Sequence, residues 1–147
     1  MNAPMYGPNI PTYYQSFGSA LRTCIIQKYA TFSGRATRSE YWFNYLAQFL
    51  LGGLLLGIAT IFSDGNPLKL LMNMGFFFVL TFLLCLAFFL PNLAVLVRRL
   101  HDTGKSGWFV FINFVPFVGP LILFVFTVMG SQPHDNQYGQ APRHRNQ

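Results

Sequence analysis

The chain has 147 residues, of which 52% are hydrophobic and 10% carry a formal charge, and its net charge is +6 at neutral pH. Soluble domains carry a charge on about a quarter of their residues, so this chain has too few polar side chains to cover a water-soluble globule. Intrinsic disorder is excluded as well, because it requires low hydrophobicity. The length allows one domain at most, and we expect that domain to lie in a membrane.

The first part of the chain predicts a short flexible start followed by an amphipathic helix. Residues 1–12 form a Pro-rich segment without the apolar core of a secretory signal. Residues 13–29 place apolar side chains on one side of a helical wheel and polar ones on the other. We expect this helix either to lie in the plane of the lipid headgroups or to pack on the loop between the second and third membrane spans.

Three long stretches without charge follow, and they predict three transmembrane helices at about 41–62, 74–97 and 108–129. About 20 apolar helical residues cross the roughly 30 Å hydrocarbon core, and backbone groups inside lipid must all be paired. The expected fold is therefore all-α: a polytopic transmembrane helical bundle of three spans plus the N-terminal amphipathic helix. These elements form a membrane domain over residues 13–130, and a polar tail occupies residues 131–147.

The third predicted span is interrupted near its middle by Pro116, Gly119 and Pro120. Proline inside a helix removes a backbone hydrogen bond and kinks the helix. We prefer a kinked crossing. The alternative is a re-entrant hairpin that returns the tail to the side on which this segment begins.

The distribution of Lys and Arg predicts the orientation. Four basic residues precede the first span and three lie in the connection after the second, whereas the first loop holds one and the tail two. Cytoplasmic loops carry the excess of basic residues. We therefore place the N-terminus in the cytoplasm and, with three spans, the C-terminus in the periplasm. Trp42 and Trp108 lie beside the basic segments, as expected for an aromatic belt at that interface.

Two motifs stand at the predicted cytoplasmic boundary. The first is Gly-Arg-Ala-x-Arg-x-Glu-Tyr-Trp at 34–42, and the second is Arg-Arg-Leu-His-Asp-x-Gly-Lys-Ser-Gly-Trp at 98–108. Pro116 with Gly119 and the run Asn-x-Tyr-Gly-x-x-Pro at 136–142 fit the same pattern. With these motifs the chain resembles the YhaH-like family of small bacterial inner-membrane proteins, a domain of unknown function. The resemblance implies an integral protein of the bacterial inner membrane, which the charge-free stretches make multi-pass, and it supplies no activity, substrate or catalytic residue.

The second motif has two interpretations. As structure, it is a helix–turn–helix hairpin in which Asp102 pairs with Arg98 at a spacing of four residues. Gly104 then ends the helix in a left-handed conformation, and Ser106 caps the third span. As a binding site, it gathers basic side chains at the inner surface, where each contributes about 1 kcal/mol next to an anionic leaflet. The candidates for binding anionic lipid or a partner are Arg35, Arg38, Arg98, Arg99 and Lys105.

Other residues are expected to shape this region and to pack the helices. Glu40 can order the basic residues by pairing with one of the arginines. The full structural motif consists of Gly34, Glu40, Trp42, His101, Asp102, Gly104, Ser106 and Trp108. In the first span, polar and small side chains form stripes along which helices approach closely. These helix-packing candidates are Asn44, Gln48, Gly52, Gly53 and Gly57.

The sequence shows no catalytic or metal-ligating constellation, and we expect neither an enzyme nor a cofactor. Gly104-Lys105-Ser106 resembles the end of a phosphate-binding loop, but Arg99 occupies the position of the required first glycine. Acid–base work by the adjacent His101 and Asp102 is not favoured either, because neighbouring residues on a helix point apart.

The leading hypothesis is a non-enzymatic interaction or accessory module whose basic cytoplasmic hairpin binds anionic lipid or a partner. The expected partners are membrane lipids, a second copy of the chain or another membrane protein, and no nucleic acid. The alternative is a subunit of an oligomeric transporter or channel for small solutes. In that case Asn44, Gln48 and Asn92 would face a wet cavity.

Overall fold

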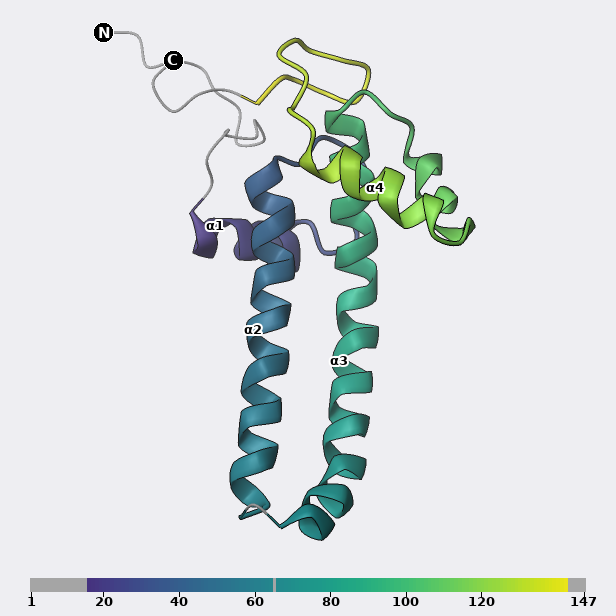
Figure 1. Ribbon diagram of the computed structural model, residues 1–147. Coiled ribbons are helices and arrows are strands. Elements are labelled where there is room, and N and C mark those ends of the chain that lie inside the picture. Colours follow the sequence, from purple (N-terminus) through teal and green to yellow (C-terminus); the bar gives the residue numbers. More distant parts are fainter. Residues whose placement is uncertain (1–15, 65, 143–147) are drawn as a thin grey trace, which may run out of the picture.

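The computed structural model describes residues 16–64 and 66–142. Every regular element in this part of the chain is helical, so the predicted all-α fold is confirmed (Figure 1). In chain order the elements are α1 (Phe17–Leu21), the π-helix η1 (Arg22–Gln27), α2 (Arg38–Phe62), α3 (Pro67–Asp102), the 3-10 helix η2 (Gly107–Phe114) and α4 (Val118–Val128). The predicted Pro-rich segment 1–12 lies outside the described residues.

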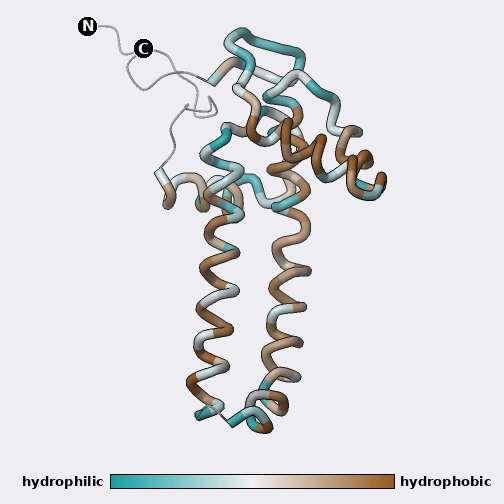
Figure 2. The backbone as a smooth tube through the Cα atoms, in the orientation of Figure 1, coloured by the Kyte–Doolittle hydropathy of each residue, from teal (hydrophilic) through white to brown (hydrophobic). Residues whose placement is uncertain are grey.

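Two helices, α2 and α3, are long and apolar enough to cross a membrane. They run side by side in opposite directions and are joined by a short turn. Each begins at a local capping signal, since the Thr37 hydroxyl accepts from the Glu40 N–H at 3.3 Å and the Asn66 side chain accepts from the Leu68 N–H at 2.9 Å. Most of their length is hydrophobic, as the brown tube in Figure 2 shows.

The helix α3 is longer than the predicted second span at 74–97. Its 36 residues correspond to about 54 Å at 1.5 Å per residue, well beyond a hydrocarbon core of about 30 Å. The extra length at its C-terminal end carries the second charged motif. Residues 98–102 of that motif are therefore helical and not part of a loop.

The third predicted span at 108–129 does not form one continuous helix. The segment forms two short helices, η2 and α4, that fold back on each other at residues 115–117. Proline lacks the N–H that a continuous helix needs, and Phe117 adopts a positive φ of 64°. Gly119 permits the close return, because a Cβ there would lie 1.9 Å from the Ile112 carbonyl oxygen. The geometry is that of the alternative hairpin, not of the preferred kinked helix.

The tail therefore returns to the end of α3 from which the hairpin departs. The Gln132 N–H donates to the Asp102 carbonyl at 3.0 Å. The expectation of a tail on the opposite side of the molecule rested on a third crossing. Without that crossing, the described tail lies at the same end as the start of α2.

The N-terminal helix predicted at 13–29 is shorter and divided, and residues 13–15 lie outside the described part. Helices α1 and η1 pack across the side of α2, where the Phe17 and Phe43 rings meet edge-on at 5.6 Å. Ala20 and Cys24 are buried on the inner side. Neither predicted docking arrangement is confirmed: within the described structure α1 contacts α2, and η1 contacts α2 and α3.

Candidate functional site

The charged residues of both motifs gather at one end of the helix pair and are almost completely buried. Their exposed fractions lie between 0% and 2%. We call this group the ionic cluster; its members are Arg35, Glu40, Arg98, Arg99 and Asp102. Burying an ion without a partner costs several kcal/mol, so the pairing of these groups decides the local fold.

One ion pair joins the two long helices. The Arg98 guanidinium, on α3, donates to the Glu40 carboxylate in the first turn of α2. The Ala36 N–H adds a hydrogen bond of 3.0 Å to the Arg98 carbonyl. Within the described structure, Nε and Nη2 of Arg98 are buried and have no hydrogen-bond partner.

The second acidic group, Asp102, is shared by two arginines. Arg35 Nε donates to one carboxylate oxygen at 2.9 Å, and Arg99 donates to the other. The predicted pairing of Asp102 with Arg98 is therefore wrong. On α3, Asp102 can reach both Arg99, three residues before it, and Arg98, four residues before it. Arg98 pairs with Glu40 instead, because α2 places Glu40 next to it.

The same arginines hold the tail against the bundle. Arg35 donates to the carbonyl oxygens of Gln132 at 2.7 Å and His134 at 2.9 Å. Arg99 donates to the Thr127 carbonyl at 3.2 Å and to that of Met129. The sequence pattern did not assign these acceptors, at the end of α4 and in the tail, a role, because backbone acceptors leave no signature in side-chain identity.

The remaining motif residues order the turn after α3. The His101 ring stacks on Tyr138 at 3.8 Å between centroids, and its Nδ1 lies 3.2 Å from the Gly34 carbonyl. Gly104 has a φ of 76°, and a Cβ there would lie 2.2 Å from the Gln132 side-chain nitrogen. Ser106 accepts from the Trp108 N–H at 3.4 Å, so it caps η2 rather than a third span.

The five predicted binding residues divide into two sets. Arg35, Arg98 and Arg99 are buried in the ionic cluster. Arg38 is exposed, and Lys105 is half-buried with its ammonium 5.6 Å from the centre of the Phe126 ring. Only this second pair lies where a headgroup could reach it.

Polar side chains expected to pack helices lie between α2 and α3. The Asn92 oxygen accepts from Asn44 and from Gln48, each at 2.7 Å, and the Asn92 amide donates back to Gln48 at 2.9 Å. Gly53 and Gly57 face open space, with no atom within 4 Å of a Cβ placed on them.

A buried thiol adjoins the cluster. Cys24 Sγ lies 3.6 Å from a Glu40 carboxylate oxygen. Burial, and next the negative charge of Glu40, raise the pKa of Cys24 to about 12. The thiol is therefore neutral at physiological pH and acts as a small apolar group. Among the described residues, no group of three or more His, Cys, Asp or Glu side chains could hold a metal ion.

Two long apolar helices joined to a charged, tail-covered end define a small helical membrane protein. The chain belongs to the family described as protein of unknown function (DUF805), which matches residues 29–140. It is similar to the inner membrane protein YhaI of Escherichia coli K12, with 37% identity over 119 residues that cover 81% of this chain and 92% of YhaI. It is also similar to the inner membrane protein YhaH of the same strain, with 34% identity over 125 residues, 81% of this chain and 93% of YhaH. No solved structure matches.

Proposed function

We propose that this inner-membrane protein crosses the bilayer twice and exposes its charged end to the cytoplasm. The end acts as a non-enzymatic interaction module for anionic lipid. The asymmetry of charge carries this proposal. Seven of the eight basic residues that the structure describes belong to segments outside the α2–α3 turn, and only Lys69 lies beside that turn, paired with Asp64 at 3.2 Å. Basic residues of short loops stay in the cytoplasm.

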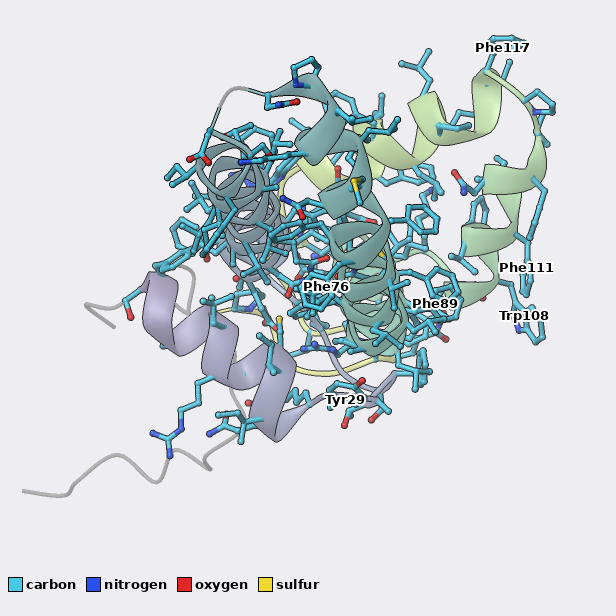
Figure 3. All side chains as sticks on the ribbon, turned by 90° about the horizontal axis from the view of Figure 1, so that it is seen from below. Tyr29, Phe76, Phe89, Trp108, Phe111 and Phe117 are labelled. Atoms are coloured by element: carbon cyan, nitrogen blue, oxygen red, sulfur yellow. The ribbon has the colours of Figure 1, made fainter. Side chains whose placement is uncertain are left out.

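The η2–α4 hairpin supports an interfacial anchor. Trp108 and Phe117 are 76% and 93% exposed, and with Phe111 they lie along the outer edge of the hairpin in Figure 3. Exposed aromatic and aliphatic side chains of this kind bind the boundary between headgroups and acyl chains. With two crossings and this hairpin in one leaflet, both ends of the chain lie in the cytoplasm.

A topology experiment tests this part. A reporter that is active only in the periplasm is fused after residue 142 or inserted at residue 64, in separate proteins. We expect periplasmic activity only from the insertion at residue 64. Periplasmic activity from the tail fusion would restore a third crossing and contradict the proposal.

The lipid contact is assigned to the accessible basic side chains. Arg38 and Lys105 are the motif residues that a headgroup can approach, whereas the buried arginines shape the surface that carries them. Each basic group near an anionic leaflet contributes about 1 kcal/mol. Removing both charges is therefore expected to lower the local preference for anionic lipid by roughly tenfold or more.

The two tryptophans provide the measurement. Trp42 and Trp108 are the only tryptophans, and both are exposed at this end. Quenching of their fluorescence by brominated phosphatidylglycerol is compared between wild type and Arg38→Gln/Lys105→Gln, with Lys69→Gln as control. We expect less quenching only in the double variant. Equal quenching in all three proteins would remove the lipid-binding proposal.

Transport receives less support from the geometry. Asn44, Gln48 and Asn92 bond to one another across the helix interface, which is the behaviour expected of packing residues. Rapid labelling of Gln48→Cys by a water-soluble reagent, in a background without the native cysteines, would instead favour a wet pathway.

A further inference from the structure

A cavity opens beside the ionic cluster, between the linker that follows η1 and the turn of the tail. Its volume is about 440 Å³, and its wall is drawn from residues 27–35 on one side and 138–140 on the other. Small-molecule sites have volumes of about 300–1,000 Å³. The cavity is therefore large enough for a headgroup or a small metabolite.

Both walls of this cavity are held in place by the protein. Arg35 lies in the linker wall, and its guanidinium binds Asp102 as well as the tail carbonyls of Gln132 and His134. The tail turn is closed by two backbone hydrogen bonds between Asn136 and Gly139, of 3.1 and 3.0 Å. A cavity with fixed walls binds a ligand without a large ordering cost.

The lining of the cavity favours an anion. It contains the cationic residues Lys28 and Arg35, the hydroxyls of Thr31 and Ser33, and no acidic side chain. Arg35 is paired with Asp102, which it shares with Arg99, whereas Lys28 forms no ion pair within the described structure. Among the described residues, the side chains of Lys28, Thr31 and Ser33 take part in none of the hydrogen bonds or ion pairs that stabilise the fold, and they are free to bind a ligand.

The ionic cluster adds a further indication, because its member Arg35 also lines the cavity. It holds three guanidinium groups and two carboxylates, so one buried positive charge is not balanced inside it. Because Arg35 belongs both to the cluster and to the cavity lining, this surplus positive charge lies beside the cavity and favours an anion there.

We propose that this cavity binds a phosphate-bearing anion. A phosphate group offers several strong acceptor oxygens, which suit one ammonium and two hydroxyl donors. The source can be the headgroup of a phospholipid or a soluble phosphate ester, since both present the same group. The site is independent of the lipid surface formed by Arg38 and Lys105.

The test measures thermal unfolding of the full chain in nanodiscs of zwitterionic lipid. Inorganic phosphate and glycerol phosphate are titrated against chloride at equal ionic strength, and phosphatidylglycerol is added to the nanodiscs in a second arm. The variant Lys28→Gln/Ser33→Ala is compared with Lys69→Gln as a matched control. Loss of a charge-assisted contact weakens binding about tenfold or more.

We expect phosphate to stabilise wild type and Lys69→Gln, with the apparent affinity lowered at least tenfold in the cavity variant. A response to soluble phosphates identifies a soluble ligand, and a response only to phosphatidylglycerol identifies a headgroup; both support the site. Absence of any response, or an equal response in the cavity variant, overturns it. Arg38→Gln/Lys105→Gln should keep the phosphate response, which separates this test from that of the lipid surface.

Discussion

Arg98 and Glu40 stand on different helices, and their buried ion pair connects α3 to the first turn of α2. Such a pair need not make the protein more stable than apolar residues of the same volume would. Removing one partner, however, leaves the other as a buried charge without a counter-ion. The buried charges of the cluster therefore determine which side chains of α2 and α3 lie opposite one another. The pair of Lys69 and Asp64 is exposed to solvent, so it does not constrain the packing in this way.

Arg98→Met is expected to lower the free energy of unfolding by about 3–5 kcal/mol, because Glu40 remains buried as an unpaired carboxylate. Arg98→Met/Glu40→Leu should recover most of this loss. Chemical denaturation in detergent measures the free energy of unfolding of wild type and of the single and double variants. Lys69→Ala, at the exposed pair, should change stability by about 1 kcal/mol at most. A double variant no more stable than Arg98→Met would contradict the pairing.

Cys24 predicts a dependence of stability on high pH. Its pKa is raised from 9.0 to about 12 by burial, so the folded protein keeps a proton that the unfolded chain releases. This contribution to stability is complete below pH 9.0 and is lost as the pH rises toward 12. The decline of stability between pH 9 and 11 should be steeper in wild type than in Cys24→Ser. Equal slopes in the two proteins would contradict the role of the buried thiol.

At the scale of elements, the η2–α4 hairpin depends on backbone contacts rather than on hydrophobicity. The segment is as apolar as a membrane span, yet α4 has only 11 residues, about 16 Å of helix. That length is far short of a crossing. The close passage at Gly119 brings the two short helices together.

Gly119→Ala is expected to open or strain the hairpin, because the added Cβ meets the Ile112 backbone oxygen at 1.9 Å. Backbone cannot move aside as cheaply as a flexible side chain, and overpacking costs about 1–3 kcal/mol. Gly53→Ala is the matched control: it lies within α2 and nothing approaches its Cβ within 4 Å. A helical Gly→Ala change of this kind should be neutral or stabilising. Unfolding of both variants in detergent checks the difference, and equal stability would contradict the tight return.

At the scale of the whole molecule, a helix pair of mostly lipid-facing residues is joined to a polar end closed by the tail. The far part of α2 and α3 leaves large apolar side chains exposed, which suits a bilayer as solvent. At the charged end, in contrast, the buried arginines bind carboxylates and the backbone carbonyls of α4 and the tail. The tail is therefore a structural component and not an appendage.

Truncation of the chain tests whether the tail is needed for the structure of the charged end. A chain that ends after Val128 loses the acceptors that Met129, Gln132 and His134 provide to the buried arginines. Each lost hydrogen bond to a charged group costs about 1.5–3 kcal/mol, so we expect poor accumulation in the membrane and a lower unfolding temperature. A chain that ends after Pro142 keeps all of these contacts and should match wild type. Equal behaviour of the two truncations would contradict the role of the tail.

The amino-acid sequence by itself determined the helical class, the two long apolar helices and the family. Charge-free stretches of this length have few other stable structures, and the family model matches residues 29–140, which include both motifs. The sequence also located the charged residues at one boundary, because basic side chains avoid the bilayer interior.

Tertiary structure alone decided the partners of the arginines and the path of the third apolar segment. Arg98 could reach Asp102 along its own helix, but Glu40 on α2 provides its partner. The third segment is apolar enough to cross, but the turn at 115–117 and the contact at Gly119 direct it back. In both cases the local pattern allowed two arrangements. For Arg98, a contact with a residue distant in sequence selected one, because Glu40 lies on another helix. For the third segment, the turn at 115–117 and the close approach of Gly119 to Ile112 selected the hairpin.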